Sequence, residues 1–201
     1  MKQTHSRLPR PVALGALLCA ALGFGAALPL HAQRDDVVQL VPFELEDQFG
    51  QRWSEADFAG RVVIVMAADR EGSEFSQAWA EALSAAFEGE LATQRVILAG
   101  VAHLRGVPFF IKGLVRGSFS KEPEEWVLLD WGGYWAEHYP FATEHMNLMI
   151  FAPDGRQVFE ATSRDVDRAL LDRMVDTVRS VLPAAPDAEP VDASLNPSTQ
   201  S

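Results

Sequence analysis

Two apolar runs separated by an amphipathic helix constrain the fold of this chain more than any other feature. Residues 62–67 are almost all β-branched or apolar, and residues 95–101 repeat the pattern. Strands that are apolar on both sides belong in the middle of a sheet with helices on both faces. Between the runs, large apolar side chains recur every fourth residue at Phe75, Trp79, Leu83 and Phe87. This spacing predicts an amphipathic helix, and the β-α-β order predicts a parallel strand pair with a right-handed crossover.

Turn residues and shorter periodic segments predict the remaining elements. Gly50 suits a hairpin turn between residues 41–49 and 51–53. The other predicted elements are a short helix from Pro108, a strand over 126–130, a short helix or loop over 132–139, a hairpin of 147–151 with 157–161, and a last helix with Val166, Leu170, Met174 and Val178 on one face. Ser73 and Ser163 are the expected N-caps of the two main helices.

The first 32 residues have the pattern of a secretory signal. Three basic residues open the chain, an apolar run follows over residues 12–28, and Ala32 offers a small residue for cleavage before Gln33. We therefore expect a periplasmic or secreted protein that meets the membrane only transiently, through its signal peptide. Two alternatives remain: an uncleaved anchor helix, which Pro29 disfavours, and a lipoprotein at Cys19.

Cleavage would change both the cysteine content and the charge of the chain. The single cysteine, Cys19, lies in the signal, and a chain without cysteine can neither form a disulfide nor present a thiolate. The signal carries three of the 17 basic residues and none of the 28 acidic ones, which leaves 14 against 28 and a net charge of −14. This charge repels phosphate backbones, so nucleic acid is excluded as an expected partner.

The rest of the chain is long enough for one domain with a proper core. We assign it to residues 33–182 and expect residues 183–201 to be a disordered acidic tail. The tail has four prolines, three acidic residues and no basic residue, so it buries too little apolar surface to offset the entropy of ordering.

Three pieces of the chain carry a family resemblance. They are residues 43–50 followed by 57–61 and the run 62–67, residues 147–155, and the last helix. In this order they resemble the thioredoxin-like superfamily, and more narrowly its redoxin branch of peroxiredoxin, TlpA-type and Sco-type proteins. Residues 107–120 and 126–155 are also similar to the YtfJ-like periplasmic proteins. The resemblance implies an α/β thioredoxin-like three-layer sandwich, in which a central mixed β-sheet has helices on both faces.

The departures from the resemblance bear on function. Redoxin enzymes place a reactive cysteine where the first helix begins, because free backbone N–H groups and the helix dipole stabilise a thiolate there. This chain has Ser73 and Ser76 at that place, and Met146 where the family has its cis-proline. A seryl nucleophile would need an adjacent base, and none is near in sequence. We therefore expect neither thiol redox activity nor a cofactor.

Five large aromatic residues are concentrated within fourteen positions, at Trp126, Trp131, Tyr134, Trp135 and Tyr139. They could pack against the sheet edge or form a recognition surface, since aromatics dominate interface hot spots. We expect a partly exposed patch.

The segment between Arg105 and Lys121 is apolar and locally basic in an acidic protein. Its cations, which include Lys112 and Arg116, could meet an acidic partner or an anionic lipid headgroup. Alternatively, the segment is an ordinary crossover helix whose basic ends extend over apolar surface.

The main functional hypothesis is a redox-inactive module that binds a protein or peptide partner in the cell envelope, or serves as an accessory subunit. Its predicted binding residues are Ser73, Phe75, Ser76, Trp131, Trp135, His145 and Met146. The alternative is a metal-binding protein or a non-thiol enzyme that uses the three histidines after the signal, His103, His138 and His145. That alternative requires at least two imidazoles to meet across one ion.

Overall fold

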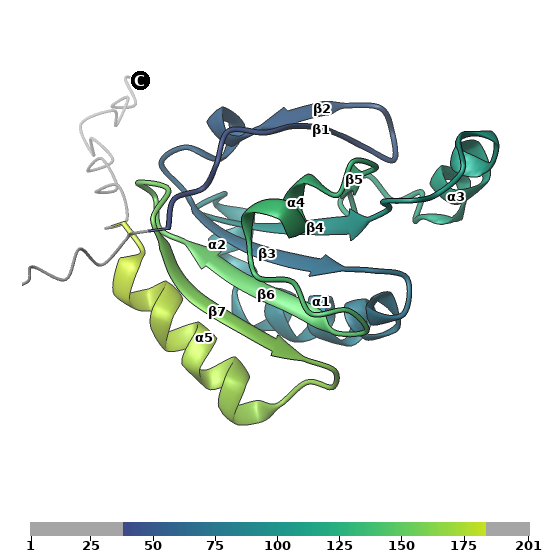
Figure 1. The fold of residues 1–201 in the computed structure, drawn as a ribbon. Coiled ribbons are helices and arrows are strands. Elements are labelled where there is room, and N and C mark those ends of the chain that lie inside the picture. The colour runs from purple at the N-terminus through teal and green to yellow at the C-terminus, as the bar shows by residue number, and fades with distance from the viewer. Residues whose placement is uncertain (1–37, 184–201) are drawn as a thin grey trace, which may run out of the picture. The chain divides into compact units, whose positions relative to one another are not determined.

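The central sheet has seven strands in the order β2-β1-β5-β4-β3-β6-β7 (Figure 1). A computed structural model describes residues 38–183, so the predicted signal and residues 184–201 of the predicted tail lie outside the described residues. The strands are β1 (Glu44–Asp47), β2 (Arg52–Ser54), β3 (Val62–Ala68), β4 (Val96–His103), β5 (Val127–Asp130), β6 (Met146–Phe151) and β7 (Gln157–Ser163). Strand β4 is parallel to β3 and β5, and the other pairs are antiparallel, which confirms the mixed sheet and both predicted hairpins.

Helices cover both faces of this sheet. Helices α1 (Ser76–Ala86) and α5 (Arg168–Val181) contribute to the core on one face, and α4 (Tyr134–His138) contributes to the core on the other (Figure 1). The remaining helical segments are α2 (Glu88–Ala92), α3 (Lys112–Ser118) and the 3-10 turns η1 (Glu55–Phe58), η2 (Gly72–Phe75) and η3 (Phe109–Ile111). This is the three-layer α/β sandwich that the sequence predicts. Within residues 38–183, no helix has both the length and the apolar character needed to cross a membrane.

Strand β3 lies in the middle of the sheet, and all of its residues are buried. It pairs in parallel with β4, from Val62 opposite Val96 to Ala68 opposite Ala102, and antiparallel with β6 on its other side. Successive side chains of a strand point to opposite faces. Strand β3 therefore supplies apolar side chains to two separate cores, which explains why its sequence has no polar position.

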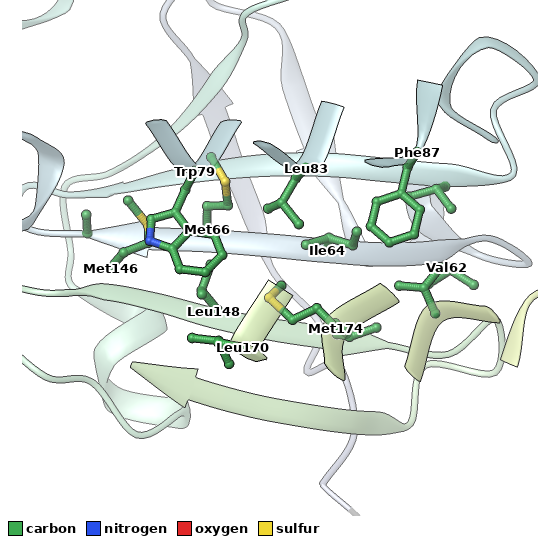
Figure 2. Packing of buried hydrophobic residues seen from close by; sticks show 14 residues of the cluster. Val62, Ile64, Met66, Trp79, Leu83, Phe87, Met146, Leu148, Leu170 and Met174 are labelled. Carbon is green, nitrogen blue, oxygen red and sulfur yellow. The ribbon is translucent and has the colours of Figure 1, made fainter. Parts of the chain in front are cut away.

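The first core lies between the sheet and helices α1 and α5 (Figure 2). Trp79, Leu83 and Phe87 are buried there with Met174 of α5, over strands β3 and β6. Burying a side chain of this kind stabilises the fold by about 1.5–3 kcal/mol. The four-residue spacing in the sequence therefore does mark the core face of a helix, whereas Phe75, at its start, is only half-buried.

The second core, on the opposite face, is rich in aromatic rings. The ring centroid of Trp135 lies 5.6 Å from that of Phe43 and 5.1 Å from that of Tyr139, which in turn lies 5.5 Å from Phe151. Offset and edge-on ring pairs at these distances add to the energy of burial. The short helix α4 is thus held to the sheet by its aromatic side chains.

The two predicted N-caps are wrong. Ser73 lies inside the turn η2, where its hydroxyl donates to the Arg70 carbonyl, and α1 begins only at Ser76. Ser163 ends strand β7, and the N-cap of α5 is Asp167, whose carboxylate accepts from the Leu170 N–H at 2.6 Å. In both places the serine hydroxyl instead donates to a nearby backbone carbonyl, that of Arg70 for Ser73 and that of Asp165 for Ser163.

The hydroxyl of Tyr139 connects the second core to the segment before β1. It accepts from the Val41 N–H at 2.8 Å and donates to the Gln39 carbonyl at 3.1 Å. Burial raises the pKa of Tyr139 to about 12. The unfolded chain titrates nearer pH 10, so the stabilisation from the neutral phenol is complete below about pH 10 and is lost as the pH rises through about 12.

The Tyr139→Phe variant should lose about 1–2 kcal/mol in free energy of unfolding near neutral pH, because the half-buried Val41 N–H loses its acceptor. The difference from the wild type should then narrow between pH about 10 and about 12, since phenylalanine cannot ionise. Urea unfolding of both proteins across this range measures the difference. A difference that stays constant with pH would contradict the assignment.

Candidate functional site at the end of strand β3

The carboxyl ends of the parallel strands lie at one edge of the sheet, where ligands of open α/β sheets commonly bind. Strand β3 leads there into residues 69–76, and the loop 143–146 approaches the same place before β6. We call these two segments together the Ser73 edge.

Asp69 joins the two segments of the Ser73 edge. Its carboxylate accepts from the Gly72 N–H at 2.8 Å and from the Glu144 N–H at 3.0 and 3.1 Å. Its backbone carbonyl also accepts from the Ser73 N–H at 2.9 Å. One side chain thus satisfies backbone donors on both sides of the site, and hydrogen bonds to an ionised acceptor are stronger than neutral ones.

Gly72 lies in close contact with the backbone of His145. A Cβ atom at Gly72 would overlap the His145 carbonyl oxygen and lie 2.8 Å from its carbonyl carbon, so no larger residue fits without a shift. The neighbouring Glu144 has a left-handed φ of +61°, a conformation that costs energy for a residue with a side chain. Its carboxylate and carbonyl are held by Arg164.

The side-chain amide of Asn147 forms hydrogen bonds with the backbone of the loop 143–146 and of the residue before it. Its side-chain oxygen accepts from the Ala142 N–H at 2.7 Å, and its nitrogen donates to the carbonyls of Ala67, Ala142 and His145. Asn147 is buried. Asn147 therefore holds this loop by hydrogen bonds. By the resemblance, it occupies the position that follows the family's cis-proline.

Ser73 and Ser76 occupy one helical turn at this edge. The Ser76 N–H donates to the Ser73 carbonyl, so the two residues have the spacing and backbone hydrogen bond of a helix start. The Ser73 hydroxyl donates to the Arg70 carbonyl at 2.6 Å, which engages its proton with a backbone oxygen and not with a general base. Within residues 38–183, the Ser73 hydroxyl therefore forms no hydrogen bond to a base of the kind that a serine nucleophile requires.

The structure brings together only part of the predicted site. Ser73, Phe75, Ser76 and His145 lie at the Ser73 edge and are exposed or half-buried. Met146 is the first residue of β6 and is 0% exposed, so it packs in the first core and has no surface to offer a partner. Its prediction as a contact residue is wrong because β6 begins with an inward-facing side chain.

The predicted exposed aromatic patch is also wrong in part. Trp135 is 0% exposed and Tyr139 is buried, both in the second core. Trp126 stacks on Trp53 with ring centroids 4.3 Å apart. Trp131 alone of the predicted binding tryptophans keeps an accessible face, beside the Lys112 ammonium at 4.8 Å, near β1 and β5 and not at the Ser73 edge.

The three histidines each contact their own neighbours. The His103 ring packs on Phe141, His138 Nδ1 pairs with the Tyr134 carbonyl, and His145 Nδ1 pairs with the Thr143 carbonyl. Across residues 38–183, no three His, Cys, Asp or Glu side chains are arranged to hold a metal ion. The geometry thus gives the histidine-based alternative no support.

Sequence analysis missed the side chains that organise the edge. Asp69 and Gly72 form an Asp-x-x-Gly turn, a signal visible in the sequence, but their contact with residues 144 and 145 is not. The sequence analysis also did not single out Asp130, the last residue of β5. It is buried and accepts from the N–H groups of Gly133, Tyr134 and Trp135, so it satisfies the first backbone donors of α4, whose N-cap is Gly133.

A shallow groove adjoins the Ser73 edge on the side of β7. It has a volume of about 470 Å³ and is lined by His145, Thr162, Ser163, Arg164, Asp165, Val166 and Asp167. Val166 is exposed, and the Arg164 carbonyl accepts from the buried Trp79 indole at 3.2 Å. The lining of the groove is therefore mostly polar, with one exposed apolar side chain. A hydrogen bond from Trp79 connects its backbone at Arg164 to the first core.

Comparison with known proteins supports the fold. No protein-family model matches the chain, and no curated protein matches it. A thioredoxin-like protein from Porphyromonas gingivalis is 18% identical with a TM-score of 0.52, over 73% of this chain and 93% of that one. Yeast Sco1 is 16% identical with a TM-score of 0.51, over 73% and 98% of the two chains. A protein from Chlorobium tepidum, assigned as thiol:disulfide interchange protein DsbE, is 14% identical with a TM-score of 0.52, over 73% and 97%.

These similarities, at low sequence identity, show the fold alone. The chain has a thioredoxin-like fold, and its structural neighbours include Sco and DsbE proteins, as the resemblance implied. The similarity to YtfJ-like proteins stays a prediction.

The Gly72→Ala variant should lose about 1–3 kcal/mol in free energy of unfolding, because the added methyl group forces Gly72 and His145 apart. Gly89→Ala is the matched control. Gly89 lies in α2 with nothing within 4 Å of an added Cβ, so alanine there should be neutral or stabilising by up to about 1 kcal/mol. Denaturant unfolding compares the two, and equal stability of both variants would contradict the close contact.

Proposed function

We propose that this chain is an exported, redox-inactive thioredoxin-like module that binds a protein or peptide at the Ser73 edge. The observation that carries the proposal is the pair Ser73 and Ser76, which occupies a helix-start turn where redoxin enzymes have reactive cysteine. The turn and the facing loop are kept in place by Asp69 and Gly72. The surface is thus retained without its thiol.

Three features of the sequence support the proposed compartment, the lack of thiol chemistry and the class of partner. The charged and apolar start of the chain is typical of a signal peptide and supports a periplasmic or secreted location. Its single cysteine, Cys19, lies within that start. The formal net charge of −11 for the whole chain argues against nucleic acid.

The chemistry of the edge supports recognition over catalysis. The Ser73 hydroxyl donates to a backbone carbonyl, and the Nδ1 atom of His145 pairs with the Thr143 carbonyl. Phe75, two residues after Ser73, is half-buried, so part of it stays accessible while the rest packs against the first core. A partly apolar surface with a few placed polar groups is typical of sites that bind peptides or small ligands.

Restoring both cysteines tests the geometry of the former thiol site. Residues three apart in a helical turn have Cα atoms about 5 Å apart, within the range of a disulfide. The Ser73→Cys/Ser76→Cys variant of the chain from Gln33, which has no other cysteine, should therefore form a reversible intramolecular disulfide. Mass spectrometry after thiol alkylation measures it. Two thiols that stay reduced with mild oxidant would contradict the proposed relation to redoxin sites.

Partner capture tests the binding itself. Ser73→Arg introduces a long charged side chain at an exposed position of the edge, and Ser84→Arg is the same change at an exposed position of α1. We expect a partner captured from envelope extract by the wild type and by Ser84→Arg, but weakened by about 1 kcal/mol or more for Ser73→Arg. Affinity is then measured with the purified partner by calorimetry. A partner held equally by both variants would place the binding site elsewhere.

A further inference from the structure

The connection between β4 and β5, residues 104–126, has an apolar surface that the rest of the domain does not cover. Phe109, Phe110 and Leu114 are 84%, 74% and 77% exposed. We call these three side chains the apolar tip. No residue of η3 or α3 is buried, and α3 stands away from the sheet (Figure 1).

The apolar tip has a defined orientation, because basic side chains of the same β4–β5 connection contact the rest of the domain. Arg116 pairs with Glu46 at 3.1 Å, and Arg105 pairs with Glu137 at 2.8 Å. The Lys112 ammonium lies 4.8 Å from the centroid of the Trp131 ring. The cationic side chains therefore face the domain body at three points, while the apolar side chains project from it.

We propose that the apolar tip docks this protein on the surface of an anionic lipid bilayer. Two exposed phenylalanines and a leucine on a protruding segment form a convex apolar surface. A convex surface of this kind needs a deformable apolar medium or a matching pocket, and the bilayer interface supplies the former without a preformed partner.

Local charge agrees with an anionic surface. Residues 105–121 contain four basic residues, Arg105, Lys112, Arg116 and Lys121, and no acidic residue, in a chain of net charge −11. Among residues 38–183, neither Lys112 nor Lys121 forms an ion pair with a carboxylate. Lys112 packs against Trp131, whereas Lys121 is exposed and donates only to the Gly117 carbonyl, so Lys121 remains available to anionic headgroups, which attract nearby lysines.

Vesicle binding tests this proposal with the chain from Gln33, which keeps every described helix and strand and both cores and excludes the apolar N-terminal run. It should co-sediment with vesicles of phosphatidylethanolamine and phosphatidylglycerol. The Phe109→Ser/Phe110→Ser variant should bind roughly tenfold more weakly or worse, because both rings lose their burial in the interface. Phe49→Ser is the matched control, since Phe49 is 48% exposed on the β1–β2 turn, and it should bind like the wild type.

A fluorescent probe separates insertion from a folding defect. An environment-sensitive label on Leu114→Cys should shift to the blue with phosphatidylglycerol vesicles and less with phosphatidylcholine alone, whereas a label on Ser84→Cys should not shift. Equal vesicle binding by the wild type and the double serine variant, or no binding by the wild type, would overturn the proposal. A dimer in sedimentation velocity that the double variant abolishes would also overturn it, and would assign the apolar tip to self-association.

Discussion

The burial of strand β3 on both faces is the constraint on which the rest of the structure depends. Strand β3 pairs in parallel with β4, so the carboxyl ends of both strands lie at one edge of the sheet. Its antiparallel pairing with β6 brings the loop 143–146 to that edge. Because its side chains alternate between two cores, α1 and α5 pack on one face and α4 on the other. The site therefore lies where this strand ends.

The residues of the candidate site are held in place by polar contacts. Asp69 satisfies donors of both segments, Asn147 satisfies groups of the loop, and Gly72 allows the two backbones to approach. In redoxin enzymes the resemblance places a cysteine at this turn. Here the same turn has serines, so the organisation of the edge does not depend on a thiol.

The sequence predicted the fold because its signals are local and periodic, as in the run 62–67 and the spacing of Trp79, Leu83 and Phe87. It failed where the outcome depends on distant residues. Asp69 contacts Glu144, 75 positions away, and no local pattern reveals that pairing. Helix α4 has five residues, too few for periodicity to distinguish the inward face with Trp135 from an exposed one. The serines expected as caps lay near the helix starts, but the choice of cap depends on loop geometry.

The contact of Gly72 with His145 has a consequence for the thermodynamics of any association at the Ser73 edge. Loops that must be ordered on binding contribute an unfavourable conformational entropy to the binding free energy. At this edge the ordering has already occurred during folding, since Asp69 and Asn147 satisfy the backbone of both segments. A ligand would meet a preformed surface, and the backbone of the free protein would differ little from that of the complex.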